Sequence, residues 1–193
     1  MDIIINIDSS SDIKKLTKKI ALYKFLYKKR NLKLKYSKTL DRKTKYELET
    51  FEKAFNLKRK KERLAYIYDR TYDFIANNYV ETNFCEFEND QCISQRIKNC
   101  KNKNGCCGEC KYLKNKRCSI NALSCKLYFC SYINKKKKAI KIKDISFANC
   151  FFTIKQKIIV SLSVFQSREK MLEILHSNSL ILWYIKTSIN NNK

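Results

Sequence analysis

Glycine and proline are nearly absent from this chain. Its 193 residues include two glycines and no proline, so turns that need a positive φ have almost no residue to form them without steric strain. Both glycines lie in the stretch NGCCGEC, where Gly105 and Gly108 flank the adjacent cysteines Cys106 and Cys107. We therefore expect the tightest backbone turn at this stretch, wrapped around cysteine side chains.

Long apolar runs are also missing. The longest candidate, LILWYI at 180–185, is far shorter than the ~20 residues that span a membrane. The first residues, MDIIINIDSSSD, lack the basic region of a secretory signal. We expect a cytoplasmic protein without a membrane partner. In that reducing compartment cysteines act as metal ligands or redox groups more often than as disulfides.

Acidic residues are scarce relative to basic ones. Lys and Arg number 42 against 18 Asp and Glu, a formal net charge of +24. This balance favours nucleic acid or another anionic surface as partner. A bias toward A/T-rich codons explains the same composition. In addition, Lys outnumbers Arg, although Arg is the residue favoured for bidentate recognition of phosphates and bases. Protein and nucleic-acid partners both stay open, and the sequence does not fix an oligomeric state.

The apolar pattern predicts a mainly α fold with little β structure. Residues 3–7 are compatible with a short strand or a helix extension, and residues 140–143 with the start of a strand. Residues 151–165 indicate a helix, and Ser167 is placed to cap a further one. Helical spacing recurs at Ile13, Leu16 and Ile20, at Leu48, Phe51 and Phe55, at Leu64, Tyr68 and Ile75, and at Ile158, Leu162 and Phe165.

The distribution of cysteine divides the chain into three regions. Residues 1–80 contain no cysteine, nine cysteines lie between Cys85 and Cys130, and one follows. We expect a helical N-terminal region at 1–80 and an irregular, cysteine-rich metal-binding module at 81–134. A basic segment and C-terminal helices at 135–193 are expected to pack with the N-terminal region as one domain.

The cysteine cluster predicts a metal site. Its spacing is C-x6-C-x7-C-x5-C-C-x2-C-x7-C-x6-C-x4-C, whereas ordinary buried cysteines would be scattered through all three regions. The chain has a single histidine, His176, so ligation must be dominated by thiolates, as in four-cysteine zinc sites and iron–sulfur clusters. The candidate ligands are Cys85, Cys92, Cys100, Cys106, Cys107, Cys110, Cys118, Cys125 and Cys130.

The spacing leaves two groupings of these ligands open. One resembles the two knuckles of a zinc ribbon, with a second ion held by the remaining cysteines and Cys118 left over. A single four-iron four-sulfur cluster, held by four of the last six cysteines, is the other. In the first grouping one ion takes Cys107, Cys110, Cys125 and Cys130, and the second takes Cys85, Cys92, Cys100 and Cys106.

Four consecutive lysines follow the cysteines. Lys135, Lys136, Lys137 and Lys138 are candidates for contact with nucleic-acid phosphates. A solvated turn explains the same run of charge.

Part of the cysteine cluster resembles a known family. The stretch GCCGECKYLKNKRCSINALSCKLYFC at 105–130 is similar to bacterial cysteine-cluster proteins described as zinc- or iron-chelating. The shared features are a doubled cysteine, a following C-x-x-L, a C-x-I and a terminal CK…C. Leu123 and Ser124 stand where many members carry Arg-Pro. The resemblance implies metal chelation, and some members are associated with protein methylation.

The function expected from these features is a cytosolic metal-binding protein. In it, thiolate-ligated zinc acts as a structural staple for an interaction surface made by the helices. The alternatives are an iron–sulfur redox protein or enzyme, and a zinc-stabilised nucleic-acid-binding protein. The chain has no phosphate-cradling glycine loop and no evident acid–base pair, so no catalytic residue is assigned and an enzymatic activity is left open.

Overall fold

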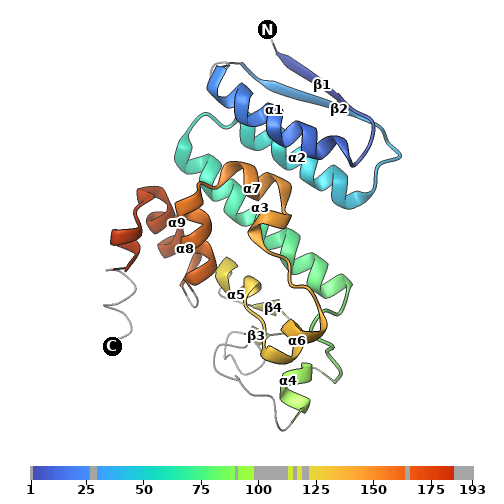
Figure 1. The fold of residues 1–193 in the computed structure, drawn as a ribbon, viewed down its shortest axis with the longest axis vertical. Helices are drawn as coiled ribbons and strands as arrows, with labels where there is room; N and C mark the ends of the chain where they lie inside the picture. Colours follow the sequence, from blue (N-terminus) through green and yellow to red (C-terminus); the bar gives the residue numbers. More distant parts are fainter. Residues whose placement is uncertain are drawn as a thin grey trace. The chain divides into compact units, whose positions relative to one another are not determined.

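The structure, a computed structural model, describes residues 2–26, 30–89, 91–97, 113–114, 117–118, 122–163 and 166–184 (Figure 1). These residues are mainly helical, which confirms the predicted fold class. The chain divides into two compact units: unit 1 is Met1–Arg70 with Lys143–Thr153, and unit 2 is Thr71–Ile142 with Ile154–Lys193. Their boundaries differ from the predicted ranges 1–80, 81–134 and 135–193, and most of the cysteine-rich stretch lies outside the described residues.

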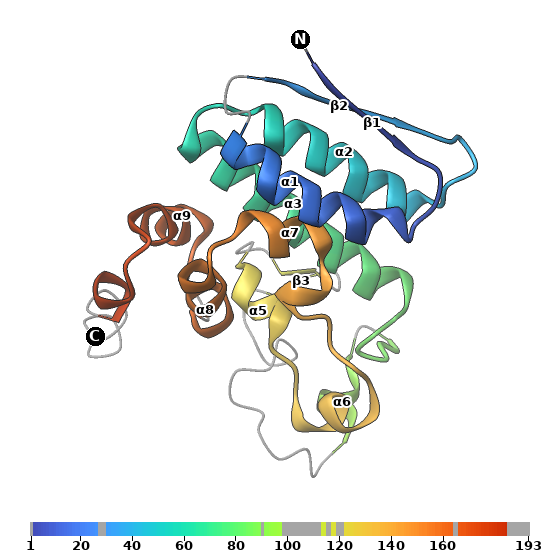
Figure 2. The ribbon, with the colours of Figure 1, turned by 45° about the horizontal axis from the view of Figure 1, so that its top comes forward.

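Unit 1 begins with a strand–helix–strand arrangement. β1 (Ile3–Ile7) and β2 (Leu32–Tyr36) are parallel, with Ile3 opposite Leu32, and α1 (Asp12–Leu26) connects them. The isoleucine-rich run is therefore a strand, as β-branched side chains favour. Figures 1 and 2 both show α1 and α2 (Arg42–Asn56) on the same side of the two strands.

The predicted helical stripes of the N-terminal region form the core of unit 1. The α2 helix is capped by Asp41, whose Oδ1 accepts the Thr44 N–H at 2.9 Å, the usual role of an N-cap aspartate. It is followed by α3 (Lys60–Glu81), and α7 (Ser146–Phe151) completes the unit. The stripe residues that are buried are Ile13, Leu16 and Ile20, then Leu48, Phe51 and Phe55, then Leu64 and Tyr68.

A buried carboxyl group caps α7. The Oε1 of Glu47, on α2, accepts the Ser146 N–H at 3.3 Å, and burial raises the pKa of Glu47, against the smaller opposing effect of the bond to Ser146. Because the folded state holds this proton more tightly than the unfolded chain, the contribution of Glu47 to stability is present at low pH. It is lost as the pH rises through the folded-state pKa.

Glu47→Gln should therefore flatten the fall of melting temperature that Glu47 causes as the pH rises above the unfolded-chain pKa of a glutamate, about 4.3. The amide oxygen of Gln keeps an acceptor for the Ser146 N–H, so the cap is retained. The check is a series of thermal melts, with Glu49→Gln, an exposed carboxyl on the same helix, as the matched control. An unchanged slope in the Glu47 variant, or an equal change in the control, would contradict the assignment.

Unit 2 is built from short elements that follow the second half of α3. Ser167 caps the helix α9 (Arg168–Ser177) as predicted, because its side chain accepts the Lys170 N–H. The two short strands of this unit, β3 and β4, pair antiparallel, with Leu113 opposite Cys118. The elements are α4 (Ile93–Arg96), β3 (Leu113–Lys114), β4 (Arg117–Cys118), α5 (Leu123–Leu127), α6 (Ser131–Lys136), α8 (Ile154–Leu162) and α9 (Arg168–Ser177), with a helical turn at 180–184.

One local prediction for the C-terminal third is wrong, and another needs a later start. Residues 140–143 do not start a strand; a 3-10 turn, η2 (Ile142–Asp144), leads into α7 instead. The helix predicted at 151–165 is present as α8, but it begins at Ile154, because α7 ends at Phe151. On α8 the buried face is that of Gln156, Ile159 and Val160, since the Gln156 Nε2 donates to the Leu175 carbonyl at the end of α9 (2.9 Å).

Candidate metal centre

The structure describes the side chains of four of the nine predicted ligands. Cys85, Cys92, Cys125 and Cys130 all belong to unit 2. Only the backbone of Cys118 is described, in β4. The remaining candidates and the predicted glycine turn lie outside the described residues, namely Cys100, Cys106, Cys107, Cys110, Gly105 and Gly108.

The loop after α3 brings Cys85 and Cys92 together. Glu88 and Gln91 exchange two backbone hydrogen bonds, of 3.0 and 2.9 Å, and the Ile93 N–H donates to the Cys85 carbonyl at 3.0 Å. The backbone therefore folds back on itself between the two cysteines. The sharp turns use left-handed residues that are not glycine: Asn83, Glu86 and Asn89 have φ of 42°, 52° and 46°.

Asparagine side chains help to hold this loop. The Asn83 Oδ1 accepts the Phe87 N–H at 2.9 Å, and its Nδ2 donates to the Phe87 carbonyl at 3.2 Å. Asn tolerates the left-handed region better than most residues because its short side chain bonds to nearby backbone. Tight turns beside cysteines therefore exist here without any glycine.

Cys130 joins the same cluster from the other end of the predicted module. It is 3% exposed and packs with Phe84, Phe129 and Ile133, and Cys85 packs against this group. The ring centroids of Phe84 and Phe129 are 4.9 Å apart. Cys130 immediately precedes α6, and its carbonyl accepts the Asn134 N–H at 3.0 Å. Two Phe-Cys pairs, 84–85 and 129–130, thus meet through their aromatic rings.

The thiols of Cys85, Cys92 and Cys130 also interact electrostatically. Burial and, after it, the neighbouring thiols of Cys92 and Cys130 raise the pKa of the Cys85 thiol to about 11, against the opposing effect of the Lys126 and Lys137 ammonium groups. A lone thiolate is unfavourable in such surroundings. A divalent cation reverses this balance, because it binds thiolates and releases their protons.

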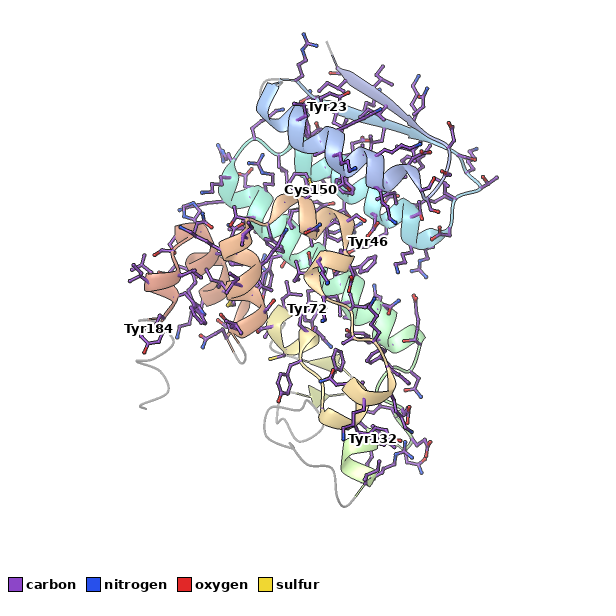
Figure 3. The ribbon with its side chains drawn as sticks, in the orientation of Figure 1. Tyr23, Tyr46, Tyr72, Tyr132, Cys150 and Tyr184 are labelled. Carbon is purple, nitrogen blue, oxygen red and sulfur yellow. The ribbon has the colours of Figure 1, made fainter. Side chains whose placement is uncertain are left out.

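The two lysines are held in place by unit 2 itself. The Lys126 Nζ lies 5.4 Å from the centre of the Tyr72 ring, a residue labelled in Figure 3. The Lys137 Nζ donates to the Phe84 carbonyl at 3.1 Å and pairs with Glu86 Oε1 at 3.2 Å. Positive charge is thereby fixed beside the cysteines, where it would offset the negative charge of metal-bound thiolates.

The run of four lysines is not a uniform basic loop. Lys135 and Lys136 are exposed in the last turn of α6, Lys137 ends that helix, and Lys138 follows, exposed. Lys137 alone turns toward the cysteine cluster. The Lys136 Nζ lies over the Tyr132 ring, 4.3 Å from its centre (Figure 3). The sequence marked Lys137 only as a possible phosphate contact, so its place beside Cys85 was missed.

The described residues do not form a complete metal site by themselves. Within them, no group of three or more His, Cys, Asp and Glu side chains is arranged to hold an ion. Cys125 is buried in α5, five residues before Cys130, and His176 lies in the last turn of α9, as expected for a helix C-terminal residue. A site at Cys85, Cys92 and Cys130 would need further ligands from the cysteines between 98 and 121.

Comparison with protein-family models, with curated proteins and with solved structures finds no match to this chain. The resemblance of residues 105–130 to the zinc- or iron-chelating family therefore stays a prediction. In the part of the chain that the structure describes, no helix combines the length and the apolar character needed to cross a bilayer.

Proposed function

We propose that this chain is a cytosolic, thiolate-ligated metal-binding protein in which zinc acts as a structural staple. Cys85, Cys92 and Cys130 are ligands in this proposal, completed by cysteines of the 98–121 segment. The observation that carries it is the meeting, in one buried aromatic cluster, of cysteines from the two ends of a nine-cysteine stretch. Zinc with four thiolates is the commonest closed site for such a ligand set.

A staple at this position would supply a constraint that the short described elements around it lack. Cys92 and Cys130 enclose a segment in which the described elements are very short: α4, β3, β4 and α5. Such elements have little helix or sheet cooperativity of their own. A metal that ties the first and last cysteines supplies the missing constraint, and its binding free energy becomes folding free energy.

The surface that the staple supports is proposed to be the exposed apolar stripe of unit 2. Ile154, Ile158 and Leu162 are spaced four residues apart on α8 and are 76%, 39% and 58% exposed. Such contiguous exposed side chains on one helix favour a protein partner. Ile181, Leu182 and Tyr184 are likewise exposed nearby in sequence, and the Trp183 Nε1 donates to Ser163 Oγ, just after α8, at 2.6 Å.

Elemental analysis with a visible absorption spectrum, on the full chain purified without oxygen, tests the proposal. We expect one or two zinc ions per chain and a colourless sample, because closed-shell Zn²⁺ has no visible absorption. About four irons with matching sulfide and a brown colour would replace zinc by an iron–sulfur cluster. A folded chain that binds neither metal would overturn the proposal altogether.

A further inference from the structure

The two edges of the β1–β2 sheet differ in how their backbone groups are bonded. On the outer edge of β2, the Leu32 N–H donates to Asn56 Oδ1 at 2.8 Å, and the Asn56 Nδ2 donates to the Leu32 carbonyl at 2.9 Å. The Leu34 N–H donates to Glu52 Oε2 at 2.8 Å. Side chains of α2 therefore take the place of a third strand on that edge.

The outer edge of β1 has no such cover. The Ile3 N–H points to β2, where it donates to the Asn31 carbonyl at 2.8 Å. Successive residues of a strand point their N–H and C=O groups to opposite edges, so the backbone groups of Ile4 and Asn6 point away from β2. Among the described residues, none bonds to the backbone of Ile4 or Asn6 on this edge. Figure 1 likewise shows β2 beside β1 on one edge only.

β1 also lacks the features that usually block an edge strand. Lysine, proline and bulges are the common devices, yet the strand reads IIINI in a chain where 42 of 193 residues are Lys or Arg. Ile4 is 56% exposed. A two-stranded sheet with one open, apolar edge is a template for a further strand.

We propose that the open edge of β1 binds an extended segment of a partner protein as the third strand of this sheet. The N–H and C=O groups of Ile4 and Asn6 would supply two donors and two acceptors at the spacing of alternate strand residues. Apolar side chains of the partner would lie on the same face of the sheet as Ile3 and Ile5. Acidic side chains of the partner would lie on the opposite face, together with Lys33 and Lys35, which pair with Ile4 and Asn6.

A second copy of this chain fits the edge less well than such a segment. An antiparallel pairing of two β1 strands about Ile5 would place Asp2 of one copy opposite Asp8 of the other, and like charges directly opposite are destabilising. The net charge of +24 on each copy opposes self-association as well. The partner is therefore a different chain, with acidic residues alternating with apolar ones.

The test uses the full chain and synthetic seven-residue peptides in which Glu alternates with Val, Ile, Phe or Tyr. Each peptide is made in two further forms, N-methylated at even or at odd positions, because successive N–H groups of a strand point to opposite edges. One methylated form should bind like the parent and the other roughly tenfold or more weakly, since it loses two or three hydrogen bonds. Equal binding of both forms, or no binding by any peptide, overturns the proposal.

Variants of β1 provide the matching control on the protein. Asn6→Pro removes a donor that points outward and so leaves the β1–β2 ladder intact, whereas Asn6→Ala keeps it. We expect the Pro variant to lose peptide binding and the Ala variant to retain it, each with an unchanged far-UV spectrum. Ile4→Glu, with Val80→Glu on α3 as its control, repeats the comparison if Asn6→Pro does not fold, because a carboxylate at position 4 would repel the acidic side chains of the peptide on the same face.

Amide exchange and oligomeric state complete the experiment. Bound peptide should slow exchange at Ile4 and Asn6 and leave Ile3 and Ile5, already in the ladder, unaffected. A peptide-free dimer protected at Ile4 and Asn6 would overturn the proposal in favour of a second copy. The nine candidate metal ligands belong to unit 2 and β1 to unit 1, so metal content reports on the proposed function separately from this test.

Discussion

Cys130→Ser should release metal from the purified chain and unfold the cysteine-containing part of unit 2, while Cys150→Ser should do neither. Structural zinc contributes on the order of 10 kcal/mol to the folding of small thiolate modules. Loss of one thiolate therefore removes a large share of unit 2 stability, about 3 kcal/mol or more. Cys92→Ser should have the same effect, because Cys92 belongs to the same group of thiols.

Cys150 is a matched control because its surroundings are those of an ordinary thiol. It lies on α7 in unit 1, where its Sγ contacts the Thr17 carbonyl at 3.9 Å (Figure 3). Serine preserves size and hydrogen-bonding capacity at both positions, so the comparison isolates the loss of a thiolate ligand. The measurements are metal per folded chain and amide exchange over residues 81–97 and 122–137.

The outcomes separate the possible ligand groupings. If Cys85, Cys92 and Cys130 share an ion, their three Ser variants lose the same equivalent of metal and the double variants lose no more. If Cys130 instead pairs with Cys107, Cys110 and Cys125, as in the zinc-ribbon grouping, the double variant of Cys92 and Cys130 loses two equivalents. Full metal content and unchanged exchange in the Cys130 variant would exclude this cysteine as a ligand.

The helices of unit 1 are the part of the fold that the sequence predicts best. Apolar residues three and four positions apart identify the buried faces of α1, α2 and α3 because each helix packs one face against the core. The same argument fails on α8, where Ile158 and Leu162 are exposed. There the direction of burial is decided by the Gln156 bond to the end of α9, a tertiary contact that periodicity does not contain.

For the candidate metal centre, the sequence predicts a chemistry but not a grouping. Nine cysteines with one histidine favour thiolate ligation, which stays a prediction, and spacing measures distance along the chain and not in space. What joins Cys85 to Cys130 is the contact of Phe84 with Phe129. The repeated Phe-Cys dipeptide was a visible signal of that contact. The turn expected at Gly105 and Gly108 stays a prediction, whereas the described turns on either side of Cys85 use Asn83 and Asn89, which also adopt positive φ.

Phe147→Ala should destabilise unit 1 by about 3–5 kcal/mol, the usual cost of removing a buried aromatic ring. Phe147 is fully buried, and its ring centroid lies 6.4 Å from those of Phe51, edge to face, and of Tyr46. It stands on α7, which packs on α1 and α2 although 72 residues separate Lys143 from Arg70 in the chain. The ring therefore links sequence-distant parts of one core.

Amide exchange in α1 and α2, measured with a thermal melt, checks this prediction. For a chain of this length the loss corresponds to a fall in melting temperature of roughly 10 °C. Ile154→Ala, at an exposed apolar side chain three residues after α7 ends, should change stability by less than about 0.5 kcal/mol. A small effect at Phe147 would mean that α7 adds little to the core of unit 1. A large effect with unchanged metal per folded chain would show that this core is held by packing, whereas the cysteine-rich segment depends on its ligands.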